Sequence, residues 1–349
     1  MTGPDPLLEL RDLEVSFNTE DGVLRAVDRV GIDLRPGEVL AVVGESGSGK
    51  SVTALTLMGL TRGPNATISG TACFEGSDLI SASEQELRGI RGNRISMIFQ
   101  DPMSSLDPVY RIGDQIVEQI RAHRDVPGEE ARARAIELLD AVGIPDAKTR
   151  ADSYPHEFSG GMRQRAMIAM ALSLEPSLLI ADEPSTALDV TVQAQIIDLL
   201  RELNEGRGLS IVLITHDIGV VAEIADRVAV MYAGRIVEQG TLDQVFYDPQ
   251  HPYTWGLLGS LTRIDRPRPA RLPQIPGMPP SLLAPPSGCH FRPRCPHAFD
   301  RCPEVPDLAA RLADAPGHVD RCWLSPGEKR ERREVDGRIG LNAGEAGAG

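Results

Sequence analysis

The sequence lacks an excess of basic residues. It has 36 lysines and arginines against 50 aspartates and glutamates, which gives a formal net charge of −14. Because a phosphate backbone is neutralised by a basic surface, this balance argues against a general nucleic-acid-binding protein. We therefore expect no nucleic-acid partner.

Long hydrophobic runs are also missing. No apolar stretch approaches the roughly 18 residues that suggest a membrane-spanning helix, and the longest, VLAVVG and LSIVLI, are strand-sized. The first residues, MTGPDPLLELRDLEV, hold no basic stretch followed by an apolar one, so we expect no secretory signal. These absences predict a soluble, cytosolic protein.

Cysteine is scarce, but its distribution is uneven. Of five cysteines, three fall within the stretch CHFRPRCPHAFDRC, Cys322 follows it, and Cys73 lies far away. In the reducing cytosol, clustered cysteines more often hold a metal than form disulfides. The cluster therefore favours a metal site over a disulfide framework.

The length of 349 residues is enough for about two domains. Strand patterns such as GEVLAVVG, SLLIAD and LSIVLIT alternate with helical patterns such as KSVTALTLMGL, which predicts an α/β fold. From about residue 88 to 158, amphipathic patterns without intervening strands predict a helical subdomain. Residues 263–288 are dense in proline, so we expect a stiff linker. Residues 325–349 are charged and then Gly/Ala-rich, so we expect a disordered tail.

The stretch GESGSGKS follows a predicted strand and precedes a predicted helix. It fits the pattern G-x-x-x-x-G-K-[ST], in which glycines let backbone N–H groups turn toward phosphates. Lys50 is expected to reach the β- and γ-phosphates, and the Ser51 hydroxyl is expected to bind Mg²⁺. The residues expected to bind nucleotide here are Gly44, Glu45, Ser46, Gly47, Ser48, Gly49, Lys50, Ser51 and Val52.

A second strand pattern, SLLIADEP, ends in two carboxylates. Asp182 is well placed to hold Mg²⁺ through water, and Glu183 follows it at the carboxyl end of the strand. A glutamate beside the metal-binding aspartate accepts a proton from the attacking water or orients it. An ordinary acidic pair at a strand end is the alternative, and the phosphate-binding loop upstream favours the catalytic role.

The stretch FSGGMRQR resembles the signature motif of the ABC-type ATPases, whose usual form is LSGGQ. Phe158 and Met162 replace its first and fifth residues. The order of motifs also matches: phosphate-binding loop, glutamine loop, signature, Asp-Glu strand and a later histidine. Over about residues 7–262 the resemblance implies a P-loop cassette with a RecA-like α/β core, an antiparallel β subdomain and a helical subdomain. We assign residues 1–262 to this cassette.

The resemblance implies ATP and Mg²⁺ as cofactors and gives roles to individual residues. Phe17 would stack on adenine, and Gln100 would contact Mg²⁺ and the attacking water and sense a membrane partner. His216 would contact the γ-phosphate and steady Glu183, and Asp189 would lie on a loop that crosses to a second cassette. The residues that would contact the ATP held by that second cassette are Ser159, Gly160 and Gly161.

One uninterrupted cassette without coiled coils resembles a transporter subunit more than the soluble ABC ATPases of DNA repair or translation. The resemblance implies a second ATPase subunit, a paralogue or the chain itself, and two permease subunits at the cytoplasmic side of the membrane. QDPMSSLDPVYRIGDQI and DPQHPYTWGLL are similar to dipeptide and oligopeptide importer ATPases, which implies an extracytoplasmic peptide-binding protein. Nickel and glutathione importers share these features, so peptides, nickel, glutathione and haem all stay open as cargo.

Gaps of five, six and nineteen residues separate the clustered cysteines, Cys289, Cys295, Cys302 and Cys322. None of these gaps is the C-x-x-C knuckle typical of structural zinc sites. Four thiolates suit Zn²⁺ or a [4Fe–4S] cluster, and residues 289–324 resemble the C-terminal extension of peptide-importer ATPases, some of which hold such a cluster. We expect a structural [4Fe–4S] cluster, with zinc or no metal as alternatives. Three histidines lie close enough in sequence to substitute in a zinc site, namely His290, His297 and His318.

Overall fold

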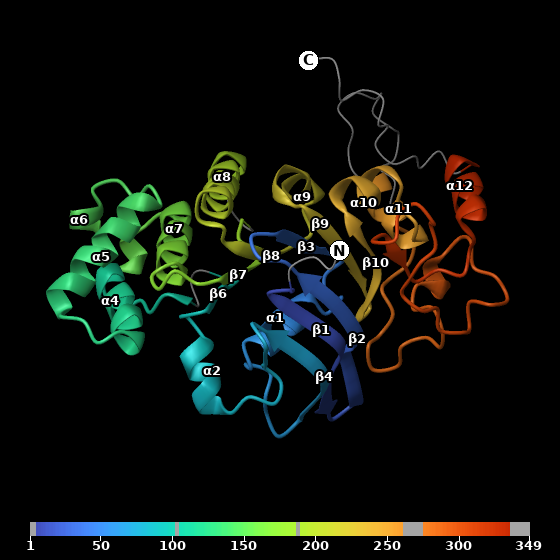
Figure 1. The fold of residues 1–349 in the computed structure, drawn as a ribbon, viewed down its shortest axis with the longest axis horizontal. Helices are drawn as coiled ribbons and strands as arrows, with labels where there is room; N and C mark the ends of the chain where they lie inside the picture. Colours follow the sequence, from blue (N-terminus) through green and yellow to red (C-terminus); the bar gives the residue numbers. More distant parts are fainter. Residues whose placement is uncertain (1–4, 102–104, 186–188, 261–274, 336–349) are drawn as a thin grey trace, which may run out of the picture. The chain divides into compact units, whose positions relative to one another are not determined.

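The computed structural model describes residues 5–101, 105–185, 189–260 and 275–335. Two compact units make up the chain (Figure 1). Of the described residues, the first unit holds those within 5–7, 34–39 and 75–214, and the second holds those within 8–33, 40–74 and 215–335.

The first unit contains three parallel strands in the order β6-β7-β8. Strands β7 and β8 are buried along their whole length, as expected for parallel strands covered on both faces. The elements of this unit are β5 (Ser77–Asp78), α2 (Glu84–Ile90), β6 (Ile95–Ile98), α4 (Ile112–His123), α5 (Gly128–Ala141), α6 (Ala147–Arg150), the 3-10 helix η1 (Pro155–Glu157), α7 (Gly160–Ala171), β7 (Leu178–Asp182), α8 (Val190–Arg207) and β8 (Ser210–Thr215).

Helices α4, α5, α6 and α7 lie together in this unit (Figure 1). In α4, Ile112, Ile116 and Ile120 recur every four residues and are buried, so they form one apolar face. The helical subdomain expected from about residue 88 contains the strand β6, which pairs in parallel with β7. Within the described residues of that span, the strand-free part therefore begins at α4. The short apolar run ISMI is too brief for its periodicity to show which element it forms.

The second unit holds two sheets. In the first, the strands are arranged β2-β1-β4, and β1 and β4 are antiparallel. In the other, β3 pairs in parallel with β9, and β9, β10, β12 and β11 follow as antiparallel neighbours. The elements are β1 (Leu8–Thr19), β2 (Gly22–Leu34), β3 (Val39–Val43), α1 (Lys50–Leu57), β4 (Ala66–Phe74), α9 (Ile218–Ile224), β9 (Arg227–Tyr232), β10 (Arg235–Thr241), α10 (Leu242–Tyr247), α11 (Pro252–Gly259), the 3-10 helix η2 (Arg292–Arg294), β11 (Ala309–Ala310), β12 (Val319–Asp320) and α12 (Pro326–Val335).

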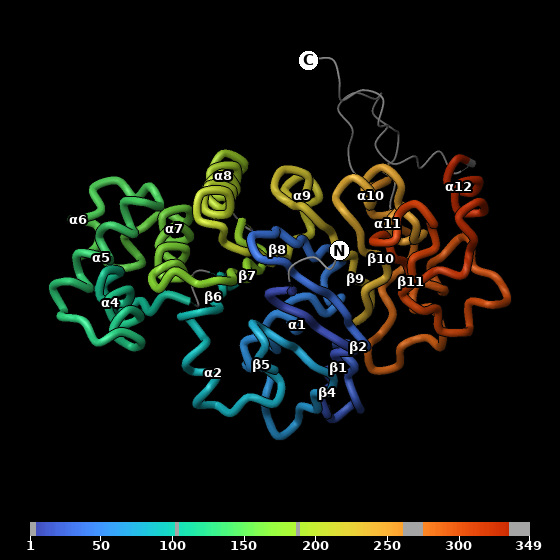
Figure 2. The backbone as a smooth tube through the Cα atoms, in the orientation of Figure 1, coloured from blue at the N-terminus to red at the C-terminus, as the bar shows by residue number. Residues whose placement is uncertain are grey.

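The backbone of the cysteine-rich region, residues 289–324, runs beside β10 (Figure 2), and its side chains share a core with the rest of the second unit. Strand β12 of this region pairs with β10, and Phe291 packs against Tyr232 and Tyr253 with ring centroids 5.3 and 5.5 Å apart. A region with so few apolar residues gains its stability from this docking. It is an extension of the second unit's core.

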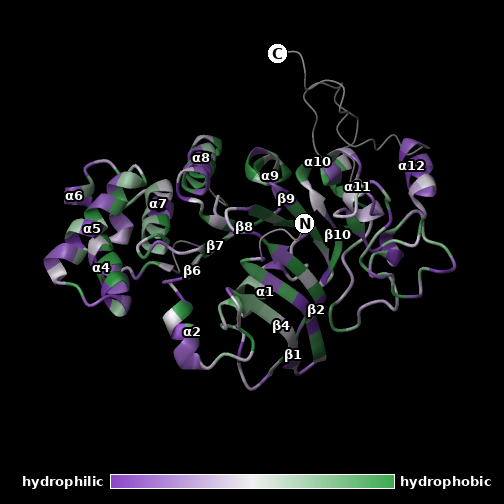
Figure 3. Cartoon of the chain, viewed as in Figure 1, coloured by the Kyte–Doolittle hydropathy of each residue, from purple (hydrophilic) through white to green (hydrophobic). Residues whose placement is uncertain are grey.

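The tail expected to be disordered from residue 325 begins as helix α12. Ser325 caps this helix, since its backbone N–H donates to Glu328 at 2.8 Å and its hydroxyl accepts from the Glu328 N–H at 3.4 Å. The helix is strongly hydrophilic (Figure 3), which explains why composition alone suggested disorder. Residues 275–288, the described part of the predicted linker, contain no helix or strand. Residues 263–274 of the linker and 336–349 of the tail lie outside the described residues.

Candidate functional site

The phosphate-binding loop joins β3 to α1. Helix α1 begins at Lys50, whose side chain is only 5% exposed. The Lys50 ammonium donates to the carbonyl oxygens of Gly44 at 2.8 Å and Glu45 at 3.1 Å, so the loop curls around its own lysine. The tip of the loop, Ser46 and Gly47, is exposed. A cation held in this way can move its hydrogen bonds to an incoming phosphate.

Two glycines of the loop tolerate no side chain. Gly44 and Gly49 have φ angles of +155° and +105°, which favour glycine. A Cβ atom on Gly44 would lie 2.1 Å from the Met231 carbonyl oxygen, and one on Gly49 would lie 2.4 Å from that of Ala26. Gly44 and Gly49 are therefore required because neighbouring backbone atoms leave no room for a side chain.

In the first unit, the two carboxylates follow strand β7 as the sequence predicts. Asp182 ends the strand and is 4% exposed, and Glu183 comes next with a φ of +50°. The Glu183 N–H donates to the Ile214 carbonyl at 2.8 Å. A non-glycine residue in this left-handed conformation is strained, and such strain gathers at functional positions.

The predicted glutamine and glutamate are brought together. The Gln100 side-chain amide donates to a Glu183 carboxylate oxygen at 3.0 Å. The two residues are 83 positions apart in sequence, and the parallel pairing of β6 with β7 places the ends of both strands at one edge. This contact fixes the orientation of the Glu183 carboxylate.

The signature residues surround the start of α7. Ser159 caps the helix by accepting from the Met162 N–H at 3.3 Å, and it is exposed together with Gly160. A Cβ atom on Gly161 would lie 2.7 Å from a methyl carbon of Val192, in the first turn of α8. Asp189 caps α8 by accepting from the Val192 N–H at 3.0 Å. Ser159 and Asp189 thus mark the N-termini of α7 and α8, and the N-terminus of a helix stabilises an anion.

The remaining predicted residues, Phe17 and His216, belong to the second unit. Phe17 lies on β1 opposite Ala66 and is half-buried. His216 is exposed and follows the last residue of β8. Their roles toward nucleotide stay predictions.

All four clustered cysteines line one small cavity. Cys289, Cys295, Cys302 and Cys322 face this space together with Phe291, Trp323 and other side chains. They are free thiols, and Cys302 is buried. The positions of the cysteines thus converge although nineteen residues separate the last two in sequence. This convergence is what a shared ligand at these thiols requires.

The cavity keeps its titratable side chains neutral. Burial raises the pKa of the Cys295 and Cys322 thiols to about 12, so without a cation these groups stay protonated. Burial lowers the pKa of His251, another lining residue, to about 3, so its ring is neutral. Its Nδ1 accepts from the Tyr253 N–H at 3.1 Å, which leaves the proton on Nε2. That nitrogen is buried without a hydrogen-bond partner in the described part of the chain.

The same thiols do not form a site for a single metal ion. Among the described residues, no group of three or more His, Cys, Asp or Glu side chains is placed to hold one. Two of the three candidate histidines bind elsewhere: His290 Nδ1 donates to the Ala233 carbonyl, and His318 Nε2 donates to Glu238, each at 2.8 Å. His297 lines the cavity and stacks edge-on against Trp255.

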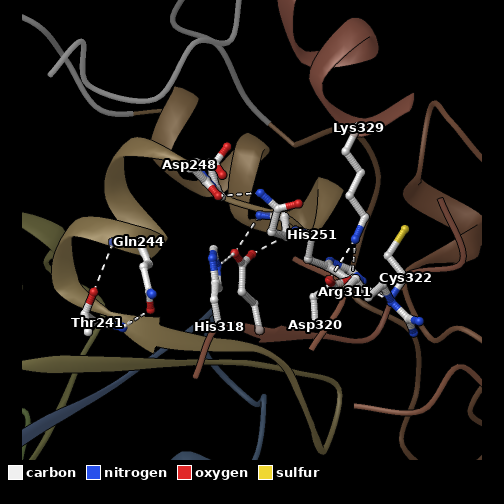
Figure 4. A network of polar contacts seen from close by, with 12 residues as sticks. Thr241, Gln244, Asp248, His251, Arg311, His318, Asp320, Cys322 and Lys329 are labelled. Atoms are coloured by element: carbon white, nitrogen blue, oxygen red, sulfur yellow. Dashed lines mark hydrogen bonds and ion pairs between the residues drawn. The ribbon is translucent and has the colours of Figure 1, made fainter. Parts of the chain in front are cut away.

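Buried polar contacts fix the cysteine-rich region to strand β10 and helix α11 (Figure 4). Glu238 is fully buried and accepts from His318 and from the backbone N–H groups of Gln250 at 2.6 Å and His251 at 2.8 Å. A second buried pair fixes helix α12 to the cysteine-rich region: the Lys329 ammonium donates to both carboxylate oxygens of Asp320 at 2.7 Å, with both side chains 1% exposed. Because removing one partner of a buried pair leaves the other uncompensated, these contacts specify one docked position.

Comparison with known proteins identifies the relatives of the chain. The family model described as ABC transporter matches residues 27–186, and the one described as oligopeptide/dipeptide transporter, C-terminal region, matches residues 237–302. The oligopeptide transport ATP-binding protein OppD of Haemophilus influenzae is 51% identical over 321 residues, covering 92% of this chain and 98% of that protein. The dipeptide transport ATP-binding protein DppD of Bacillus subtilis is 50% identical, covering 92% of this chain and 95% of that protein.

Solved structures of ATP-binding cassette proteins also match the chain. The ATP-binding cassette MJ0796, in a dimeric post-hydrolysis state bound to ADP and phosphate, matches with a TM-score of 0.61 and 27% identity over 67% of this chain and 98% of that chain. The structure of cbiO1 from Clostridium perfringens, part of an ABC transporter complex, matches with a TM-score of 0.59 and 30% identity over 70% and 92%. The chain belongs to the ABC transporter family, among the oligopeptide and dipeptide transport ATP-binding proteins.

Proposed function

We propose that this chain is the ATP-hydrolysing subunit of an importer that takes up oligopeptides or dipeptides. The observation that carries the proposal is a phosphate-binding loop and signature helix within a chain that is about half identical, over nearly its whole length, to peptide transport ATP-binding proteins. Relatives with these names favour transport over DNA repair or translation. Nickel and glutathione are the alternative cargoes to be tested.

The residues of the phosphate-binding loop hold the substrate ATP. Lys50 exchanges its carbonyl partners for the β- and γ-phosphates, and the backbone N–H groups at the start of α1 face the same charge. Phe17 stacks on the adenine ring. Ser51, Gln100 and Asp182 would hold Mg²⁺. When bound, this ion neutralises charge on the phosphate oxygens.

Glu183 is the general base of the proposed mechanism. Its carboxylate takes a proton from the attacking water, and the amide of Gln100 at 3.0 Å keeps the carboxylate in place. His216 contacts the γ-phosphate. Ser159, Gly160 and Gly161 at the N-terminus of α7 face the ATP of a second cassette, and Asp189 lies beside that junction. ATP thus joins two cassettes, and hydrolysis releases them.

The chain needs membrane partners to act in transport. In the described part of the structure, no helix is both long and apolar enough to cross a bilayer. We propose that two cassettes, this one with itself or with a paralogue, dock on two permease subunits at the cytoplasmic face, and that an extracytoplasmic binding protein delivers the cargo.

This assembly predicts the result of a co-purification. When the tagged full chain is isolated from detergent-extracted membranes, we expect two permease chains to accompany it in equal amounts with the cassettes. Because ATP joins the cassettes, the recovered complex is expected to contain two of them. Recovery of the chain with nucleic acid or ribosomes and without permeases would contradict the transporter assignment.

We also propose that the four cysteines bind a [4Fe–4S] cluster, with Zn²⁺ as the alternative. The support is a cavity lined by all four thiols, which come from separate stretches of residues 289–324. Zinc requires sulfurs about 2.3 Å from one ion. Among the described side chains, no group of three or more is already placed to hold a metal ion, so either metal would have to draw the thiols together. A four-iron cluster is larger, and each thiolate binds a different iron, so its ligands are spaced more widely. The cluster would join the loops of residues 289–324, which share little core of their own.

A further inference from the structure

The cysteine-rich region contacts the phosphate-binding loop through one arginine. Arg294, the last residue of η2, is 7% exposed, and its guanidinium forms a two-point ion pair with Glu45, at 2.6 and 3.1 Å. Glu45 is the second residue of GESGSGKS. A bidentate arginine–carboxylate pair of low exposure fixes direction as well as distance.

Three further hydrogen bonds hold the Arg294 guanidinium in this position. Its Nε donates to the Pro276 carbonyl at 2.9 Å, and its terminal nitrogens donate to the Ile275 carbonyl and the Tyr232 hydroxyl, each at 3.3 Å. The cation also lies over the Tyr232 ring, 5.7 Å from its centroid. The arginine is therefore preorganised, and Glu45 is the group it positions.

A tyrosine holds the backbone of the same loop residue. The Glu45 N–H donates to the Tyr253 hydroxyl at 2.9 Å, and burial raises the pKa of Tyr253, so the hydroxyl stays neutral. Tyr253 packs against Tyr232 and Phe291, and Phe291 lies between Cys289 and Cys295 in sequence. Both the side chain and the N–H of Glu45 are thus held from the C-terminal part of the chain.

We propose that Arg294 is a positioning residue for ATP binding, which acts through Glu45 to keep the phosphate-binding loop in its receptive shape. The Glu45 carbonyl is one of the two backbone acceptors of Lys50, so the orientation of this peptide affects the lysine directly. Arg294 immediately precedes Cys295. The folding of the cysteine-rich region therefore sets where Arg294 lies, and through Glu45 it affects the shape of the phosphate-binding loop. This inference rests on the proposed nucleotide site and adds a residue outside the cassette motifs to it.

A double-mutant cycle on the full chain tests the proposal. Arg294→Ala is expected to raise the Kd for a fluorescent ATP analogue with Mg²⁺ by about ten- to a hundredfold, the loss typical of a hydrogen bond to a charged group. In a chain that already carries Glu45→Ala, Arg294→Ala should add less than about a twofold change, because its partner is gone. In the assembled transporter we expect KM for ATP to rise while kcat at saturating ATP changes little, since Arg294 does not touch the reacting groups.

Two control variants separate the possible failures. Arg333→Ala removes a similar arginine, which donates to Asp248 at 2.5 Å and to the Pro249 carbonyl at 2.8 Å, and should leave the Kd unchanged. Lys50→Ala should weaken binding strongly, and a Lys50→Ala chain that binds ATP normally would contradict the nucleotide site itself. If Lys50→Ala weakens binding while Arg294→Ala does not, or if the effects of Arg294→Ala and Glu45→Ala simply add, the inference about Arg294 is wrong. Circular dichroism and metal content, measured on each variant, verify that the compared chains are folded.

Discussion

Replacing Glu183 with glutamine is expected to reduce ATP hydrolysis by about 10²–10⁴-fold, the usual contribution of a general base. The amide keeps the shape of the carboxylate and can still pair with Gln100, but it cannot accept the proton of the attacking water. ATP binding should persist, because the phosphate-binding loop is untouched. The variant should therefore accumulate as ATP-bound, joined cassettes, measured by nucleotide content and by the size of the complex.

A matched substitution elsewhere gives the baseline for this experiment. Glu205 lies on the exposed surface of α8, so Glu205→Gln makes the same chemical change away from β7 and should retain full activity. A Glu183→Gln variant that hydrolyses ATP at close to the normal rate in the assembled transporter would show that another group is the base.

Loss of one cysteine ligand is expected to remove the metal. Anaerobically purified protein should be brown, absorb broadly near 400 nm and contain about four irons per chain, as [4Fe–4S] proteins do. Cys295→Ser should lose most of this iron and lower the temperature of unfolding, because the loops of residues 289–324 would lose a common anchor. Iron analysis, absorption spectra and thermal unfolding measure these changes.

Cys73→Ser is the control for this loss. Cys73 lies on β4, and it is absent from the lining of the cysteine cavity. Iron content and colour should therefore stay unchanged in this variant. Colourless anaerobic protein with one zinc per chain would contradict the cluster and leave the zinc alternative.

Much of the fold was predictable because its strands and loops carry strong local signals. The stretches GEVLAVVG and SLLIAD contain short apolar runs, VLAVV and LLIA, which form β3 and most of β7. The phosphate-binding loop was identified by glycines that the backbone requires, as the close contacts at Gly44 and Gly49 show. The family resemblance gave Gln100 and Glu183 separate roles toward the attacking water, and the hydrogen bond between their side chains is visible only in the structure.

What sequence reasoning missed depends on contacts between distant segments. Nothing in the local pattern around Arg294 indicates a partner 249 residues earlier, and Tyr253 was noticed only as part of a family-specific stretch. Helix α12 was taken for a disordered tail because it is highly charged. The sequence SPGE, with Ser325 and Glu328 spaced as a capping box, could have indicated the start of a helix. The buried ion pair between Lys329 and Asp320 could not be predicted from the local sequence.

The most direct test of the account is peptide uptake by the complete assembly in vesicles. The chain, its permease partners and the binding protein are reconstituted, and ATP hydrolysis is measured together with uptake of labelled dipeptides, longer peptides, Ni²⁺ and glutathione. We predict that a peptide raises the rate of hydrolysis and accumulates inside, and that Glu183→Gln abolishes both effects. Stimulation and uptake with Ni²⁺ or glutathione, and none with any peptide, would contradict the proposed function.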